Sequence, residues 1–222
     1  MRPLVDPVAS LAPEELIRTA RHAVLSGIGE LVVIDDDVVE RTNLQRQLLH
    51  RVDDIGIPKT TSAARAVRGL SPITRVREEN RRLTPDNARE LLAGAHVVID
   101  GSDTFDTRSA VASATDELGM PLVWGAVQEW SAQVTVFWSR PPAGHSPVAL
   151  SDVFPADSVG EPPTCAQVGV LGSLCVQVGG LLATEAIKLV TGAGDPLLGR
   201  MAIIDALRAR HDIVPLVARR TP

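Results

Sequence analysis

Two short apolar runs constrain the fold of this chain more than any other feature of its sequence. The segments LVVID at 31–35 and HVVID at 96–100 each contain consecutive apolar residues and end in an aspartate. A strand with this pattern is buried on both faces, which is typical of a parallel sheet covered by helices. Helical patterns alternate with strand patterns along the chain. We therefore expect an α/β, Rossmann-like fold with a mostly parallel sheet and helices on both faces.

Helix caps and apolar periodicity place the remaining elements. Ser10 has the position of a helix N-cap, because Pro13 and two glutamates follow it and the apolar pattern ends at Gly27. Residues 139–164 are rich in Pro, Ser, Gly and Asp and predict a long flexible crossover loop. We expect further helices at 59–69, 85–95, 106–119 and 166–191, and further strands at 73–79, 121–127, 132–138, 201–206 and 211–217.

The bulk composition limits the class of protein. With 222 residues, 45% of them hydrophobic, the chain can bury a core, and we expect a single domain over 1–222. The net charge of −5 and the lack of a basic run argue against nucleic-acid binding. The N-terminus has no apolar segment of the secretory type, and two cysteines are too few for a disulfide framework, so we expect a cytoplasmic protein.

One apolar run, at 166–184, is long enough to suggest a membrane span. Gln167 and Gln177 interrupt it, and Glu185 and Lys188 follow at once. Its leucines and valines recur at helical spacing, as in a buried helix of a large α/β core. We therefore expect a core helix and no membrane partner.

Acidic side chains stand at the ends of the two buried strands. Asp35 ends the first strand, and Asp100 and Asp103 follow from the second. The carboxyl ends of parallel strands meet at one edge of the sheet, where α/β proteins bind their ligands. Two or three carboxylates in such a crevice suit a ribose or a Mg²⁺ ion. The alternative interpretation is that these aspartates only cap their own loops.

The loop after the first buried strand carries a second group of polar side chains. It reads DDDVVERTNLQRQLLHRVDDIGIPK and places Asn43, Arg46, Gln47 and Lys59 between a strand end and a helix start. Arg offers a fixed fork to phosphate oxygens and Lys a point charge, so this set suits a triphosphate. A charged loop that is merely solvated would have a similar composition.

The order of these residues resembles the signature of the ThiF/MoeB/HesA adenylyltransferases, bacterial relatives of the ubiquitin-activating enzymes. The loop fits D-x-D-x-V-x-x-x-N-L-x-R-Q, and a G-x-P-K motif places its lysine thirteen residues after the arginine. The similarity runs from about Arg21 to Ala206, through VVIDGSDTFDTR, PLVWGAVQEWSAQVTVF and TCAQVGVLGSLCVQVGGLLATEAIKLV.

The resemblance implies a reaction that uses ATP and Mg²⁺. The C-terminal carboxylate of a small ubiquitin-like sulfur-carrier protein would attack the α-phosphorus and expel pyrophosphate. That carboxylate is already ionised at pH 7, so the reaction needs positioning and charge neutralisation rather than a general base. The family also implies a homodimer.

The resemblance further implies roles for particular residues. Asp35 would hold the ribose, Asn43 and Arg46 the polyphosphate, Lys59 the α-phosphate, and Asp103 the Mg²⁺ ion. The implied nucleotide-binding set is Asp35, Asp37, Asn43, Arg46, Gln47, Lys59, Asp103 and Thr104. The implied catalytic set is Arg46, Lys59, Asp103 and Cys165.

Cys165 aligns with a cysteine that some relatives link covalently to their carrier. Its position between the predicted loop and the apolar helix would allow a reactive thiol. A small buried residue is the alternative interpretation, because most isolated cysteines have that role. Cys175, inside the apolar helix, is expected in the core.

The sequence departs from the family most strongly at its N-terminus. Family members have a first strand and a G-x-G-G-x-G loop that contacts the phosphates of ATP. Here the four glycine positions fall at about Leu11, Pro13, Glu14 and Leu16. We therefore expect the first strand and the glycine loop to be missing, which would expose a sheet edge and leave the chain marginally stable or partner-dependent.

Two further departures concern zinc and the adenine side of the site. The first cysteine pair of the family's zinc site aligns with Leu150 and Val153, and the C-terminal segment has no cysteine, so we expect no zinc. His145 and His211 are expected at the surface. Thr104 replaces the asparagine that usually follows the magnesium-binding aspartate.

Two other functions stay open. A non-catalytic family member would bind a carrier or partner protein without ATP turnover. The missing glycine loop favours this alternative, whereas retention of Asp35, Asn43, Arg46, Lys59 and Asp103 opposes it. A nicotinamide dehydrogenase would explain the strand-end aspartate, but the dinucleotide glycine fingerprint is absent.

Overall fold

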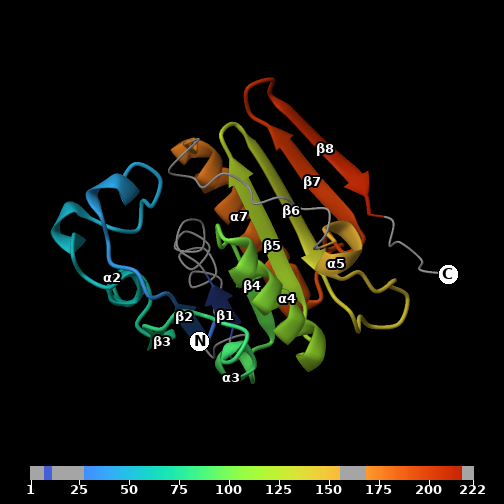
Figure 1. Ribbon diagram of the computed structural model, residues 1–222, viewed down its shortest axis with the longest axis horizontal. Coiled ribbons are helices and arrows are strands. Elements are labelled where there is room, and N and C mark those ends of the chain that lie inside the picture. The colour runs from blue at the N-terminus through green and yellow to red at the C-terminus, as the bar shows by residue number, and fades with distance from the viewer. Residues whose placement is uncertain (1–7, 12–27, 156–168, 217–222) are drawn as a thin grey trace.

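Figure 1 shows the computed structural model, which describes residues 8–11, 28–155 and 169–216. The described strands form one sheet in the order β3-β2-β1-β4-β5-β6-β7-β8. The strands are β1 (Val8–Leu11), β2 (Glu30–Ile34), β3 (Arg75–Glu79), β4 (Val97–Asp100), β5 (Leu122–Gln128), β6 (Ser131–Phe137), β7 (Arg200–Asp205) and β8 (Arg210–Pro215). The helices are α2 (Lys59–Arg68), α3 (Ala88–Leu92), α4 (Phe105–Leu118), α5 (Leu150–Val153) and α7 (Gly172–Thr191), with 3-10 turns η1 (Arg41–Asn43) and η2 (Val52–Asp54).

The sheet combines a parallel half and an antiparallel half. Strands β3, β2, β1, β4 and β5 pair in parallel, whereas β5–β6, β6–β7 and β7–β8 pair antiparallel. The connections from β5 to β6 and from β7 to β8 are too short for a crossover, which requires antiparallel pairing there. The structure thus confirms the predicted α/β fold and its mostly parallel sheet.

The prediction that the first strand is missing is wrong. Val8–Leu11 forms β1, which pairs in parallel with β2 on one side and with β4 on the other. Ser10 is therefore a strand residue rather than a helix N-cap. Two flanking hydrogen-bond ladders stabilise this extended segment, and they outweigh the local capping signal of Ser10. Because β2 and β4 are both paired with β1, the sheet edge expected from a missing strand does not form.

The rest of the predicted first helix lies outside the described residues. This also holds for three of the four positions aligned with the family's glycines, Pro13, Glu14 and Leu16. The fourth, Leu11, is the last residue of β1 and pairs with Ile34 and Asp100.

Helices cover both faces of the sheet at β4 and β5, where the core is deepest. Val97, Val98 and Ile99 of β4 are fully buried. In Figure 1, α4 lies in front of these strands and α7 behind them. Both helices contribute buried residues to the same hydrophobic core, among them Val111 of α4 and Val178 of α7.

Helix α7 is long and apolar enough to cross a membrane by length and composition. In the structure it packs on the sheet, and Leu174, Val178 and Leu182 on one of its sides are fully buried. Glu185 is buried as well, where it pairs with Lys188 at 2.7 Å and accepts a hydrogen bond from the backbone of Leu197. This burial fits the predicted core helix, whose start lies at Gly172.

The predicted crossover loop at 139–164 is ordered over its described part. Trp138 and Val148 exchange two backbone hydrogen bonds, and α5 follows directly. Leu150 packs into the core, and the ring of Phe154 lies 5.2 Å from that of Trp124. The remaining residues of this segment lie outside the described residues, and the flexibility of the loop stays a prediction.

Candidate functional site

The sheet has a topological switch point beside β1. From β1 the chain proceeds to β2 and β3 on one side, and then returns to β4 on the other side of β1. Because β1 pairs with β2 on one side and with β4 on the other, the strand order reverses beside β1, and such a reversal opens a crevice at the carboxyl ends of the strands. In open α/β sheets this crevice is the usual ligand site.

A cavity of about 350 Å³ lies at this edge. One wall is the segment after β2 with Asp35, Asp36 and Asp37. The opposite wall is the turn after β4 with Ser102, Asp103 and Thr104, and the loop after β3 contributes Arg81 and Arg82. The cavity thus brings together four of the predicted nucleotide-binding residues, Asp35, Asp37, Asp103 and Thr104.

Asp35 is the buried carboxylate of the cavity. It is 9% exposed, and its Oδ1 accepts a hydrogen bond of 2.8 Å from the backbone N–H of Asp37. Burial raises the pKa of Asp35 to about 6, against the opposing effect of the Lys59 charge. The carboxylate oxygens of Asp35, Asp36 and Asp37 lie within 4.8 Å of one another, close enough to share a cation.

Lys59 is the buried cation next to these carboxylates. Its side chain is 4% exposed, and its Nζ lies 2.8 Å from Oδ2 of the half-exposed Asp37. The backbone N–H of Lys59 donates to the carbonyl of Asp37, which ties the first turn of α2 to the end of β2. An ammonium group with a carboxylate partner at the cavity rim is placed to exchange that partner for a phosphate oxygen.

Asn43, Arg46 and Gln47 lie on the loop between β2 and α2 and do not line the cavity. The side-chain oxygen of Asn43 accepts from the backbone of Glu40, so this residue shapes its own turn. Arg46 donates to the carbonyl of Thr42. Gln47 is fully buried, and its amide makes no hydrogen bond within the described part of the chain.

The same loop packs tightly on the start of α7. At Gly172, a Cβ atom would lie 2.3 Å from the backbone oxygen of Gln45 and 3.4 Å from Cα of Arg46. Only glycine allows this approach of two backbones. The close contact fixes the Arg46 segment against a helix of the core.

Asp103 and Thr104 differ in their roles within the turn after β4. Thr104 is the N-cap of α4, where its hydroxyl accepts from the backbone of Thr107 at 3.3 Å. Asp103 is exposed at the cavity wall. Among the described residues, the three carboxylates close enough to share an ion are those of Asp35, Asp36 and Asp37, and Asp103 is not one of them.

Sequence reasoning missed a buried polar network beneath the loop. Nδ1 of His50 lies 2.8 Å from the hydroxyl of Ser62, which in turn donates to Asp54 at 2.9 Å, and Arg65 pairs with the same carboxylate. Since the Ser62 proton goes to Asp54, His50 must carry its proton on Nδ1. Burial, with a smaller effect of Lys59, lowers the pKa of His50 to about 4.

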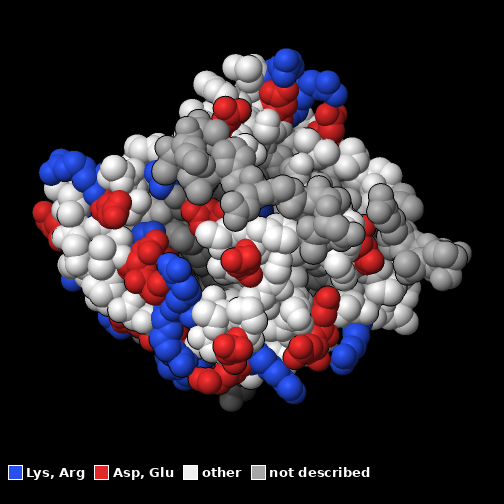
Figure 2. Space-filling model, viewed as in Figure 1, with Lys and Arg blue, Asp and Glu red and all other residues white. Residues whose placement is uncertain are grey.

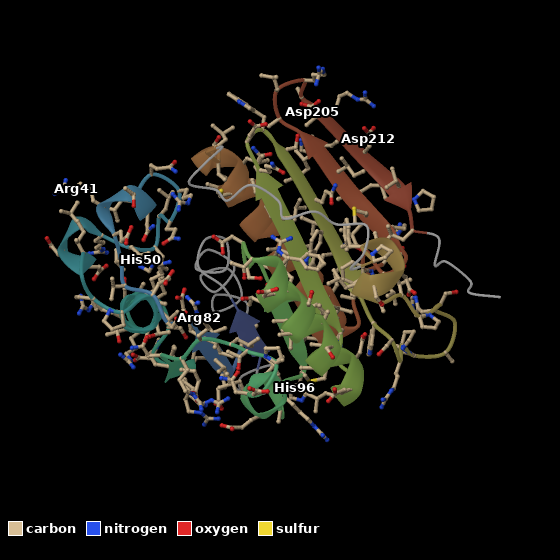
Figure 3. The ribbon with its side chains drawn as sticks, viewed as in Figure 1. Arg41, His50, Arg82, His96, Asp205 and Asp212 are labelled. Carbon is tan, nitrogen blue, oxygen red and sulfur yellow. The ribbon has the colours of Figure 1, made fainter. Side chains whose placement is uncertain are left out.

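Sequence reasoning also missed the arginines after β3. Arg82 pairs with Asp36 at 3.0 Å across the mouth of the cavity. Figure 3 shows His50 and Arg82 on the β2–β3 side of the molecule, with Asp205 and Asp212 on the β7–β8 hairpin at the opposite side. The available signal for Arg82 was its position in the loop that follows β3, a strand of the parallel half.

Of the two cysteines, the structure describes Cys175 and does not describe Cys165. Cys175 is buried in α7, as predicted. Cys165 lies outside the described residues, so its role stays a prediction. Leu150, at a position where relatives have a zinc-binding cysteine, is 6% exposed, and His145 and His211 are exposed, as predicted.

The parallel sheet, its switch point and the acidic cavity at the carboxyl ends of β2 and β4 define a Rossmann-like domain with a ligand site of the nucleotide-binding type. The chain belongs to the ThiF family, whose family model matches residues 18–222.

Relatives with assigned names share a substantial part of this sequence. The probable adenylyltransferase/sulfurtransferase MoeZ of Mycobacterium tuberculosis is 34% identical over 96% of this chain, which spans 63% of that protein. The sulfur carrier protein adenylyltransferase of Thermus thermophilus is 39% identical over 91% of this chain and 74% of its own length. This chain thus spans less than two thirds of MoeZ.

A solved structure shares the fold. The crystal structure of E. coli MccB with ATP superposes with a TM-score of 0.79 over 100% of this chain and 66% of MccB. The sequences are 20% identical, so this likeness concerns the fold.

Proposed function

We propose that this chain is an ATP-dependent adenylyltransferase that activates the C-terminal carboxylate of a small ubiquitin-like sulfur-carrier protein. The observation that carries the proposal is the cavity at the switch point, which Asp35, Asp37 and Asp103 line, and the buried Lys59 that pairs with Asp37. The names of the relatives, adenylyltransferase/sulfurtransferase and sulfur carrier protein adenylyltransferase, support the reaction and the partner.

The residues of the cavity fit ATP and a magnesium ion. Asp35 is a buried acceptor at a strand end, as ribose hydroxyls require, and Lys59 provides a cation next to it. The hydroxyl of Ser102 is buried at the cavity wall without a hydrogen-bond partner in the described part of the chain. Asp103, with the Asp35–Asp37 group, offers the oxygen ligands that Mg²⁺ prefers. MccB, which has the same fold, was solved with ATP bound.

In this proposal the chain holds reactants and neutralises charge. One oxygen of the carrier carboxylate bonds to the α-phosphorus, and the bond from that phosphorus to the bridging oxygen of the β-phosphate breaks, so pyrophosphate leaves. No proton is transferred, because the attacking carboxylate is already ionised. Lys59 would stabilise the charge on the α-phosphate, and Arg46, on the loop outside the cavity lining, would hold the polyphosphate. Asp103 would hold a Mg²⁺ ion, which would supply further charge neutralisation.

The proposal also includes a cytoplasmic location and a homodimer. On the face in Figure 2, acidic and basic side chains are interspersed, and the described residues form no continuous basic surface there. This pattern fits a protein partner rather than a nucleic acid. Light scattering behind a sizing column measures the mass, and a monomer at micromolar concentration would remove the homodimer from the proposal.

Calorimetry with Mg-ATP on this chain tests the proposal. We expect micromolar binding that is lost in Lys59→Ala and in Asp103→Ala and retained in the control Arg89→Ala, which changes an exposed residue of α3. Binding lost in both variants then justifies a carrier screen by pyrophosphate exchange. Wild-type protein that is folded but binds no ATP would contradict the proposal.

That second outcome would favour the non-catalytic alternative. Its specific support is that Leu11, Pro13, Glu14 and Leu16 occupy the positions of the family's glycines. In that case the chain would bind a carrier or another family member through its fold alone. A pull-down with the wild type and with Lys59→Ala would then give equal recovery of the partner.

A further inference from the structure

Arg108 presents two unpaired nitrogens next to the cavity. Its Nε donates to the carbonyl of Ser102 at 2.7 Å, and its guanidinium carbon lies 5.0 Å from the ring centre of Trp124. These two contacts fix the plane of the guanidinium group. Within the described residues, the two terminal nitrogens make no hydrogen bond and no ion pair, and the side chain is partly exposed.

Buried polar groups without partners surround this guanidinium. Trp124 and Ser102 are each 3% exposed, and within the described residues neither the indole Nε1 of Trp124 nor the hydroxyl of Ser102 has a hydrogen-bond partner. Asp100 is fully buried, and only its Oδ1 is used, by the backbone N–H of Ser102. The indole of Trp124 and the hydroxyl of Ser102 are buried donors without acceptors in the described part of the chain. Such donors are costly, so the pair indicates that a ligand supplies the acceptors.

The order of strands places Arg108 on the far side of the cavity from Asp35. Along the carboxyl edge the strands follow as β2, β1, β4 and β5, and Trp124 of β5 is in register with Asp100 of β4. In the proposed function, a nucleoside held by Asp35 would lie on the β2 side, and its α-phosphate would lie at the switch point between β1 and β4. A group bonded to that phosphate would extend toward β5, and Arg108 lies there, over the ring of Trp124.

We propose that Arg108 binds the acyl carboxylate of the carrier protein and orients it toward the α-phosphorus. The proposal rests on the adenylyltransferase function above. A guanidinium fork matches a planar carboxylate, and it can hold one oxygen while the other attacks phosphorus. Stacking on Trp124 and the bond to Ser102 position the fork before the substrate arrives, which lowers the entropic cost of binding.

A structural role for Arg108 is the competing interpretation. Its charge lies near the buried Asp100, whose pKa is raised by burial and partly lowered again by Arg108. Replacement of Arg108 could therefore disturb the turn that carries Asp103 and Thr104. A purely structural role predicts that every ligand of the cavity is weakened together and that the melting temperature falls.

The test uses an acyl-adenylate analogue, so no carrier protein is needed. The probe is 5′-O-[N-(glycyl)sulfamoyl]adenosine, which keeps the acyl oxygen and the nucleoside, and Mg-ATP is the reference ligand. Both are titrated by calorimetry into the wild type, Arg108→Gln, Arg108→Lys and the exposed control Arg89→Gln. In Arg108→Gln we expect the dissociation constant of the probe to rise about tenfold or more, while that of Mg-ATP changes less than about twofold.

Arg108→Lys separates the fork from the charge. We expect it to bind the probe nearly as weakly as Arg108→Gln does, because a lysine ammonium cannot take the fixed donor position that the contacts with Ser102 and Trp124 give the guanidinium. Equal weakening of the probe and of Mg-ATP in Arg108→Gln, or no weakening of either, overturns the proposal. AMP, titrated into the wild type as a ligand without an acyl group, gives the baseline, and a wild type that binds Mg-ATP but binds the probe no better than AMP also overturns the proposal. A wild type that binds no Mg-ATP contradicts the proposed function instead.

Discussion

Asp35, a residue of the proposed nucleotide site, reduces the stability of the fold when it is ionised. Burial raises its pKa from 3.8 to about 6, so the native state binds a proton more tightly than the unfolded chain does. The stability of the folded state therefore falls as the pH rises from 3.8 to 6, and the loss persists above pH 6. The shift corresponds to at most about 3 kcal/mol.

We therefore predict that Asp35→Asn stabilises the folded chain at pH 8 by about 1–3 kcal/mol and has little effect at pH 4, because asparagine removes the buried charge and keeps the oxygen that binds Asp37 N–H. Urea denaturation at the two pH values measures the difference. The same variant should bind Mg-ATP at least tenfold more weakly, because the ribose loses a charged acceptor. An equal change of stability at both pH values would show that the carboxylate charge is not responsible.

His50 should affect stability in the opposite direction over the same pH range. Its pKa falls from 6.5 to about 4 on folding, so the unfolded chain binds the proton more tightly. Stability is then complete above pH 6.5 and is lost as the pH falls toward 4, by up to about 3 kcal/mol. Lys59 opposes protonation and Asp54 favours it, and Arg65 holds the Asp54 carboxylate.

The prediction is that His50→Asn, which keeps a donor toward Ser62, is less stable than the wild type above pH 6.5 but loses the additional acid sensitivity between pH 6.5 and 4. Free energies of unfolding from urea titrations at half-unit pH steps measure this slope. His145→Asn, at an exposed position, serves as the control and should keep the wild-type slope. A variant slope equal to that of the wild type would assign the acid sensitivity to other groups.

At the scale of elements, the contact between α7 and the loop that carries Arg46 depends on one glycine. A Cβ at Gly172 would lie 2.3 Å from Gln45 O, so the loop or the helix must move. At Gly180, in the interior of the same helix, a Cβ atom would have no neighbouring atom within 4 Å. The two positions form a matched pair, because the same substitution meets an obstacle at one and open space at the other.

Gly172→Ala should therefore destabilise the chain by about 1–3 kcal/mol through overpacking and should weaken Mg-ATP binding through displacement of Arg46. Gly180→Ala should instead stabilise it by about 0.5–1 kcal/mol, because alanine has the higher helix propensity. Thermal melts and calorimetry with Mg-ATP measure both effects. If Gly172→Ala binds Mg-ATP like the wild type, the loop position is not important for the nucleotide.

Elements with a strong local signal could be predicted from the sequence, and those set by tertiary pairing could not. The unbroken apolar runs before Asp35 and Asp100 predicted β2 and β4, and helical periodicity predicted α2, α4 and α7. β1 was missed because four residues give little periodicity and Ser10 also fits a cap. Its strand conformation comes from β2 and β4, which are far from it in sequence.

In the candidate site, too, some residues could be predicted from the sequence, whereas contacts between elements could not. The ends of parallel strands predicted that Asp35 and Asp103 would line one cavity, and the structure places both there. No sequence pattern indicated that Arg108 would lie over Trp124 or that His50 would reach Ser62. These contacts join different elements, and their partners depend on how the helices pack on the sheet.

For the whole molecule, the proposed nucleotide site at the carboxyl edge of the sheet would couple ligand binding to global stability. The cavity is built from segments that follow β2, β3 and β4, so its residues converge only in the folded chain. A ligand that binds only this state stabilises it by an amount that grows with its concentration relative to the dissociation constant. At one hundred times that constant the gain is about 2.7 kcal/mol.

We predict that Mg-ATP at this concentration raises the melting temperature by about 5–10 °C, since 1 kcal/mol corresponds to roughly 2–4 °C for a chain of this size. Excess EDTA should remove most of the rise, because ATP without the metal leaves the phosphates and the Asp35–Asp37 carboxylates to repel each other. Lys59→Ala should show no rise at the same ligand concentration. A rise that persists in EDTA would mean that the nucleotide binds without a metal, and the acidic group would then serve the ribose alone.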